Sequence, residues 1–186
     1  MKLTDGEKLV LIMLCDLHKK LGLDEEIDPN FVKSAILSDN LWGINWKFSG
    51  IPFEREETPK DVLEVLDILD MWSLIERSVE LLPEKEKAVL EKRAAPFGKN
   101  VKFGGFDGNH ETSYLGIAEF LIRDLERFQE FKDRDLNSHM PTIGMYRRMI
   151  KVFKPIKSEL DTSNYHLNAE QLITILLEQI HSDNRK

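Results

Sequence analysis

Apolar side chains that recur every three or four residues constrain the fold of this chain more strongly than any other feature of its sequence. This spacing places the side chains on one face of an α-helix, whereas a half-buried strand needs strict alternation. The pattern occupies about seven segments, which are expected at residues 5–21, 29–38, 59–77, 83–95, 110–132 and 142–157 and after Asn168. It predicts an all-α fold, a compact single-domain bundle of about seven helices that spans residues 1–186.

Capping residues and prolines mark where these helices begin. Thr4 and Glu7 have the spacing of a capping box, in which each side chain bonds the backbone N–H of the other residue. Asn168 and Gln171 repeat this spacing before the last helix. Two of the other helices begin at a capping residue followed by proline, which suits the first helical position. Gly22 is expected to end the first helix in a left-handed conformation.

Two helices differ from the simple one-sided pattern. The first carries seven consecutive apolar residues, 9–15, and we expect its neighbours to cover most of its sides. In the helix at 59–77 the polar residues recur every three positions, so that its polar strip winds slowly round the axis. We therefore expect this helix to be central and to form the core together with the helices at 5–21 and 110–132.

The connector at residues 41–53 combines four large aromatic residues with glycine and proline. Such aromatic residues fold back onto the body of a protein or face a partner. On the first interpretation they close one end of the helical core, with a short strand as an option. On the second, Trp42, Trp46 and Phe48 line a groove for a ligand or another subunit. The carboxylates that follow at 54–57 are expected to form a solvated turn.

The most varied polar cluster of the chain lies in the loop at 133–141, between the fifth and sixth expected helices. Arg134 has the planar guanidinium group that pairs with carboxylate or phosphate, and His139 titrates near neutrality. One interpretation closes this loop on itself through Asp–Arg and Asn–backbone hydrogen bonds. The other presents it as a polar site for a small ligand or a partner.

The helix at 142–157 carries a basic face. Its cations are Arg147, Arg148, Lys151, Lys154 and Lys157. We expect them mainly to balance the acidic rows of the helices at 59–77 and 110–132. Contact with nucleic acid is the weaker interpretation, because no outward aromatic residues alternate with the cations to stack on bases. Pro155 is expected to bend or end this helix.

Composition narrows the classes of protein to which the chain can belong. The net charge of −7 argues against nucleic acid as the main partner, and the single cysteine fits a reducing, cytoplasmic compartment. No signal peptide and no apolar run of membrane-spanning length is visible, so we expect no membrane partner. We also expect no cofactor and no metal, because the carboxylate row at 61–70 has no histidine beside it.

Several segments in order resemble the bacterial YfbU-like family. They are LWGINWKFSGI, VLDILDMW, FGGFDGNHE, YLGIAEFLIRDLERF, KDRDLNSHMP and MYRRM. The resemblance implies an all-helical cytoplasmic domain. It also implies ligand sensing, since such domains occur beside helix-turn-helix modules, and a link to cell death in enterobacterial members. It brings no catalytic residues with it.

Three hypotheses about function follow. The first is a non-enzymatic ligand-sensing or protein-interaction domain that self-associates and in which Arg134 clamps an anion or carboxylate. Its candidate ligand-binding residues are Trp42, Asn45, Trp46, Arg134, Asp135, Asn137, His139 and Arg147. The second is a small hydrolase that uses Asp135 and His139 as base and orienting group. The third is weak association with nucleic acid through the basic face at 147–157.

Overall fold

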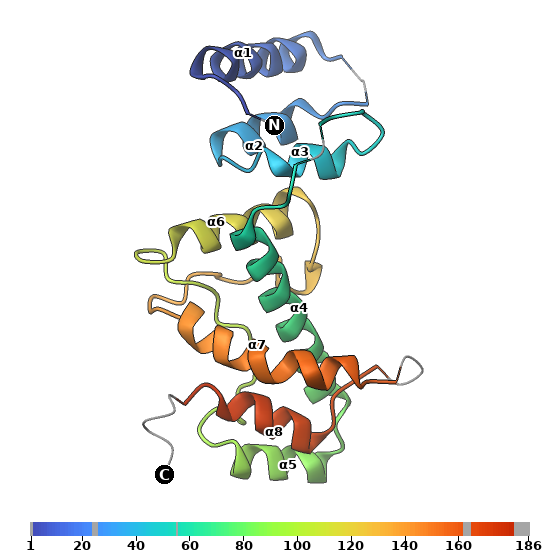
Figure 1. Cartoon of the computed structure of the whole chain (residues 1–186), viewed down its shortest axis with the longest axis vertical. Coiled ribbons are helices and arrows are strands. Elements are labelled where there is room, and N and C mark those ends of the chain that lie inside the picture. Colours follow the sequence, from blue (N-terminus) through green and yellow to red (C-terminus); the bar gives the residue numbers. More distant parts are fainter. Residues whose placement is uncertain (1, 24–25, 55, 162–164, 181–186) are drawn as a thin grey trace.

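The computed structural model describes residues 2–23, 26–54, 56–161 and 165–180, and over these residues it has eight α-helices and no β-strand (Figure 1). The helices are α1 (Asp5–Leu21), α2 (Pro29–Leu37), α3 (Trp42–Lys47), α4 (Lys60–Leu81), α5 (Glu84–Arg93), α6 (Thr112–Glu119), α7 (Ile143–Ser158) and α8 (Ala169–Leu177). The all-α prediction is therefore confirmed. The number exceeds seven because the connector after residue 41 begins with the short helix α3 rather than with a loop or strand.

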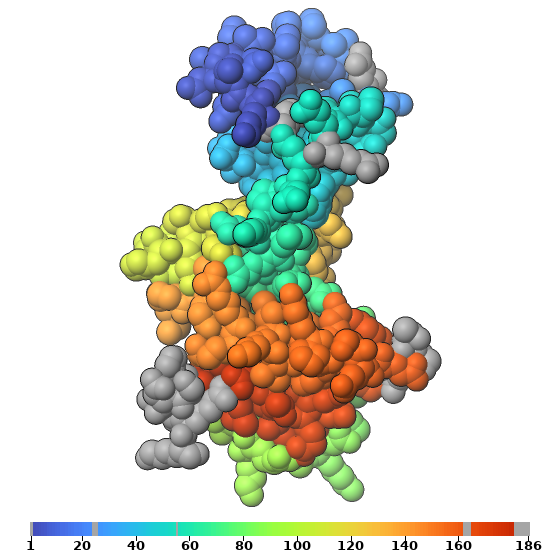
Figure 2. All heavy atoms as spheres, viewed as in Figure 1, coloured from blue at the N-terminus to red at the C-terminus, as the bar shows by residue number. Residues whose placement is uncertain are grey.

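Helix α4 runs through the middle of the molecule and links the N-terminal helices to the rest. Helices α1, α2 and α3 lie together at one end, and α7, α8 and α5 are stacked at the other (Figure 1). The space-filling view narrows between the N-terminal helices and the rest of the molecule (Figure 2). Each end has a hydrophobic cluster of its own, a large one around α4 and a smaller one around α2 and α3.

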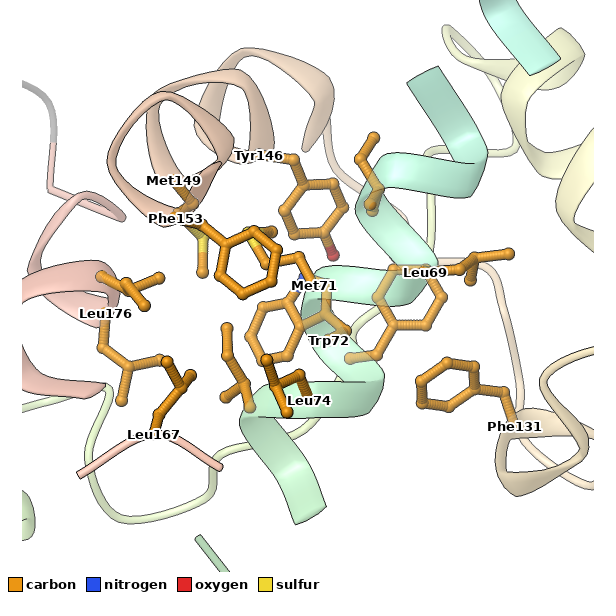
Figure 3. Packing of buried hydrophobic residues seen from close by; sticks show 14 of the residues in the cluster. Leu69, Met71, Trp72, Leu74, Phe131, Tyr146, Met149, Phe153, Leu167 and Leu176 are labelled. Atoms are coloured by element: carbon orange, nitrogen blue, oxygen red, sulfur yellow. The ribbon is translucent and has the colours of Figure 1, made fainter. Parts of the chain in front are cut away.

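The large cluster confirms the expectation that the helix predicted at 59–77 is central. α4 buries nine side chains along its length: Val62, Val65, Ile68, Leu69, Met71, Trp72, Leu74, Ile75 and Ser78. Figure 3 shows Met71 and Trp72 of α4 beside Tyr146 and Phe153 of α7, with Leu176 of α8 on the other side of Phe153. Burying one large apolar side chain contributes about 1.5–3 kcal/mol, so this helix dominates the core.

The first helix has the predicted ends but not the predicted surroundings. Thr4 and Glu7 form the capping box, and Gly22 takes the left-handed conformation at the C-terminal end. However, Cys15 is the one buried residue among those of α1, and several large apolar side chains face outward. The expectation that α1 is covered on most sides and belongs to the core is wrong, because one apolar face packs on the small cluster and the opposite face stays uncovered.

The prediction of one continuous helix at 110–132 is also wrong. α6 ends at Glu119 and passes into a π-turn, Phe120–Asp124, followed by a loop and a short 3-10 helix, Gln129–Phe131. Glu126 and Phe128 adopt positive φ angles of 54° and 50°, which end the regular helix. The side-chain amide of Gln129 donates to the carbonyl oxygen of Ile122 at 2.7 Å and so stabilises the break.

The π-turn joins the two ends of the molecule through Phe120. Its ring is 2% exposed and packs against Phe31 of α2 and Trp42 of α3, with both ring centroids 5.5 Å away. Gly43 lies so close that an added Cβ would stand 2.3 Å from the Phe120 ring. A glycine is therefore required where α3 crosses this phenylalanine.

The apolar segments of the chain are short. None of the helices in the described ranges has both the length and the apolar composition that crossing a membrane would require.

Pro155 was expected to bend or end the helix at 142–157. It lies inside α7, which continues to Ser158, so it does not end the helix, and the bend stays a prediction.

Candidate functional site

A hollow of about 740 Å³ lies beside α3 and the chain that leads from it to α4. Trp42, Asn45 and Trp46 all line it, because residues spaced by three and four positions share one face of a helix. The remaining lining residues come from the loop before α3 and from the chain after it: Asp39, Leu41, Ser49, Ile51, Pro52, Phe53, Glu54, Glu56, Glu57, Thr58 and Pro59. Trp42 and Trp46 of the connector thus line a hollow, whereas Phe48, expected beside them, packs against Phe31 in the small hydrophobic cluster.

The two indole rings of this hollow are held in a fixed arrangement. Their centroids lie 4.9 Å apart and the ring planes meet at 74°, an edge-to-face contact. The indole N–H of Trp42 donates to Oδ1 of Asn40 at 2.9 Å. The guanidinium of Arg127 lies 5.3 Å from the centre of the Trp46 ring, so this ring already binds one cation of the chain itself.

The charged residues that line the hollow are all acidic among the residues described. Asp39, Glu54, Glu56 and Glu57 contribute carboxylates, and the described part of the lining contains no lysine or arginine. The expected solvated turn at 54–57 is thus one wall of a cavity, as far as its described residues show. Carboxylates on a cavity wall favour a cation over an anion, although Lys8 lies 3.6 Å from Asp39 and Arg127 lies over Trp46, so part of this charge is already balanced.

Asn45 adds a polar atom without a partner. Its Oδ1 is buried and accepts no hydrogen bond; among the described side chains, the one other buried polar atom without a partner is the donor Nε1–H of Trp72. Buried polar atoms normally have hydrogen-bond partners, so an orphaned acceptor at a cavity wall needs an explanation.

Arg134, the predicted anion clamp, lies elsewhere and is already engaged. Its guanidinium donates two hydrogen bonds, both 2.7 Å long, to the carboxylate of Glu76 on α4. This pairing raises the pKa of Arg134, chiefly through the hydrogen bonds to Glu76. The ion pair also positions the backbone, because the same Glu76 accepts from the N–H of Phe103 at 2.7 Å.

The rest of the polar loop closes on itself. Asp135 accepts from the N–H of Asn137 at 2.9 Å, and Oδ1 of Asn137 accepts from the N–H groups of Gly108 and His139, each at 3.0 Å. The interpretation through Asn–backbone bonds is confirmed, whereas the expected Asp–Arg bond is wrong because Arg134 pairs with Glu76. The backbone of His139 has a positive φ of 54°, and no side-chain contact between Asp135 and His139 is present in the described part of the chain.

Arg147 belongs to a third place, between α7, α4 and α6. It donates to Glu64 at 2.6 and 2.9 Å and to the hydroxyl of Tyr114 at 3.2 Å, while Tyr114 donates to Glu64 at 2.7 Å. The hydrogen bond from Arg147 lowers the pKa of Glu64, and burial together with Glu64 raises the pKa of Tyr114 to about 12. This cluster stabilises the packing of three helices.

Two of the remaining cations of α7 balance α4, as predicted. Lys154 and Lys157 pair with Asp67 at 2.6 Å and Asp70 at 2.5 Å. Arg148 donates instead to the backbone carbonyls of Glu178 and Gln179 near the end of α8. These pairings leave little of the basic face for phosphate groups, and so the structure gives the nucleic-acid hypothesis no support.

One buried network escaped the sequence analysis. The carboxylate of Glu111 accepts from the N–H groups of Asp107, Thr142 and Ile143 at 2.7–3.0 Å and thereby holds the start of α7. Asp107 in turn contacts Nδ1 of His110 at 2.6 Å, and the N–H of Asn109 together with this histidine lowers the pKa of Asp107. Asp107 and Glu111 lie in the segment DGNHE, but no spacing within this segment identifies Thr142 and Ile143 as the partners of Glu111.

Comparison with known proteins places this geometry in a family. The sequence model described as the YfbU domain matches residues 1–177, which is nearly the whole chain. The chain belongs to the YfbU family. The UPF0304 protein MJECS11 of Methanocaldococcus jannaschii, a relative, is 32% identical over 117 residues. This match covers 60% of the chain and 64% of that relative. The family predicted from the sequence is therefore confirmed.

Proposed function

We propose that this YfbU-family chain is a non-enzymatic binding domain whose hollow beside α3 receives an organic cation with an apolar body. The observation that carries the proposal is the pairing of two indole rings with lining charges that are all acidic among the described residues. Such a cavity favours an organic cation in two ways: its apolar surface contacts the body of the ligand, and its carboxylates attract the charge.

The aromatic wall supplies the first contribution. The face of an indole ring attracts a cation by about 0.5–2 kcal/mol, depending on how far water is excluded. Arg127 already lies over the ring of Trp46, so the cation of the ligand would meet the ring of Trp42 or the part of the Trp46 ring that Arg127 leaves uncovered. Leu41, Ile51 and Pro52 extend the wall with apolar surface for the body of the ligand.

The carboxylates supply the second contribution. Glu54 and Glu57 line the hollow on the side of the connecting chain, and Asp39 lines it on the side of the loop before α3. A cation bound among them gains Coulomb energy that salt weakens, since the Debye length is about 8 Å at physiological ionic strength.

The other hypotheses receive less support. The hydrolase would need Asp135 and His139 in contact, but Asp135 bonds the backbone of Asn137. The anion clamp would need a free guanidinium group, but Arg134 is bound to Glu76. The ligand sensing and regulation that the family resemblance implies would therefore act through the cavity at α3.

Isothermal titration with two matched probes tests the proposal. Choline carries a quaternary ammonium group, and neohexanol has the same shape with carbon in place of nitrogen. We expect choline to bind at least about tenfold more tightly, a difference of about 1.4 kcal/mol. Equal binding of the two probes, or preferential binding of an anion such as acetate, would contradict the proposal.

Two variants locate the binding. Trp46→Ala removes the ring, and Glu54→Gln with Glu57→Gln removes two lining charges. Each change should weaken choline binding several-fold, and the second should also reduce its dependence on salt. The matched control is Glu86→Gln with Glu91→Gln on α5, at the far end of the molecule (Figure 1), which should leave binding unchanged.

A further inference from the structure

Helix α1 presents a continuous apolar face that no other element of the described chain covers. Six large side chains on it are between 52% and 71% exposed: Leu9, Val10, Met13, Leu14, Leu17 and Leu21. The opposite face of the same helix already packs on the small hydrophobic cluster through Leu11, Ile12 and Cys15. Monomeric soluble proteins rarely leave so long an apolar stripe in water, so this face marks an interface.

The shape of the face is that of a helix built to pack against another helix. One shallow hollow on it has four apolar lining residues, Val10, Met13, Leu14 and Leu17, with Asp16 and Lys20 at its edge. Four residues at spacings of three, four and seven form the hole that receives one side chain of a facing helix in knobs-into-holes packing. A second hollow lies at the start of the helix and is lined by Leu3, Gly6, Glu7, Val10 and Leu11, of which Leu3 precedes the N-cap.

The helix carries the matching knobs as well as the holes. Leu14 and Leu21 are also seven residues apart. If a second α1 runs antiparallel with its centre near residue 14, its Leu14 falls opposite the hole at 10–17 and its Leu21 opposite the hollow at the start of the helix. Gly6 leaves this second hollow open, since no atom lies within 4 Å of the position that a Cβ would occupy.

The charges of α1 favour the same partner in the same direction. The first turn is acidic, with Asp5 and Glu7, and the last turn is basic, with Lys19 and Lys20. An antiparallel pair places Glu7 of one copy near Lys20 of the other, twice, whereas a parallel pair would place like charges together. The opposed helix dipoles add to this preference.

We propose that the exposed face of α1 is the dimer interface of this protein and that its occupant is the α1 helix of a second copy, packed antiparallel about a two-fold axis near Met13 and Leu14. This proposal is independent of the ligand assigned to the hollow at α3. It also gives a physical basis to the expected self-association, through a surface that the sequence analysis had assigned to the core.

Sedimentation equilibrium of the full chain tests the proposal. We expect a mass of twice the 21.6 kDa chain for the native protein and of one chain for Leu14→Asp, with unchanged helical circular dichroism. Leu81→Asp, on an exposed leucine of α4, is the matched control and should remain dimeric. A native protein that is monomeric at every concentration would overturn the proposal, because the exposed face of α1 would then have a different occupant. A dimer that Leu14→Asp leaves intact would also overturn it.

Cross-linking tests the direction of the helices. Leu14→Cys lies near the two-fold axis and should form an intermolecular disulfide under mild oxidation, while Leu21→Cys lies far from its counterpart and should not. A parallel pair would cross-link through both positions and would contradict the antiparallel arrangement. The native protein controls for Cys15, which is buried on the inner face of α1.

Discussion

Phe120→Ala should loosen the junction between the two ends of the molecule. The ring is 2% exposed and lies against Phe31 and Trp42, both at 5.5 Å. Truncation of a buried phenylalanine to alanine costs about 3–5 kcal/mol through lost burial and the cavity that remains. Because the total stability of a domain is about 5–15 kcal/mol, we expect a loss near 4 kcal/mol that removes a large part of it.

The assay is unfolding in urea, followed by circular dichroism and by tryptophan fluorescence. Phe120→Leu keeps most of the apolar volume and loses the ring contacts, so it should cost about 0.5–1.5 kcal/mol. Leu81→Ala removes a side chain that is 62% exposed and should change stability by less than about 0.5 kcal/mol. A loss below about 1 kcal/mol for Phe120→Ala would refute the reasoning that this ring joins the two clusters.

Three further outcomes follow from the polar and glycine-dependent contacts. Gly105→Ala should cost more than about 1 kcal/mol in urea unfolding, because φ is +83° and the new Cβ would stand 1.9 Å from the carbonyl oxygen of Leu136. Glu111→Gln should cost about 1–3 kcal/mol by the same assay, since three backbone N–H groups share its carboxylate. Because Arg147 lowers the pKa of Glu64 in the folded state, their ion pair stabilises above the ordinary carboxyl pKa near 4.3 and is lost as pH falls through the depressed value. Urea midpoints measured down this range should fall less steeply in Arg147→Met, and identical slopes would contradict the assignment.

The parts of the fold that the sequence predicted correctly are those that local chemistry determines. The capping boxes at Thr4 and Asn168 and the proline at the start of α2 depend on residues within one helical turn. The central position of α4 followed from its winding polar strip. These features need no knowledge of the rest of the chain, and the structure reproduces them.

The errors arose where distant residues decide the conformation. Apolar periodicity continues through Leu125, but the π-turn and the left-handed Phe128 depend on how Phe120 packs on α2 and α3. An apolar helix has the same sequence whether its outer face meets its own chain or another one, so α1 was wrongly placed in the core.

The candidate site was predicted in part for the same reason. Trp42, Asn45 and Trp46 are close in sequence and lie together at the hollow, as the connector suggested. Arg134 meets Glu76 across 58 positions, and Arg147 meets Glu64 across 83, distances over which no pattern in a single sequence identifies partners. The structure thus separates the eight predicted residues into one cavity and two groups of structural contacts.

Fluorine NMR of the protein labelled with fluorotryptophan tests the central claim most directly, because the chain has three tryptophans. Trp42 and Trp46 line the hollow, whereas Trp72 is 2% exposed in the core of α4. Addition of choline should shift the two signals from the hollow with a common dissociation constant and leave the signal of Trp72 in place. Three unmoved signals, or a shift of Trp72 alone, would contradict the account.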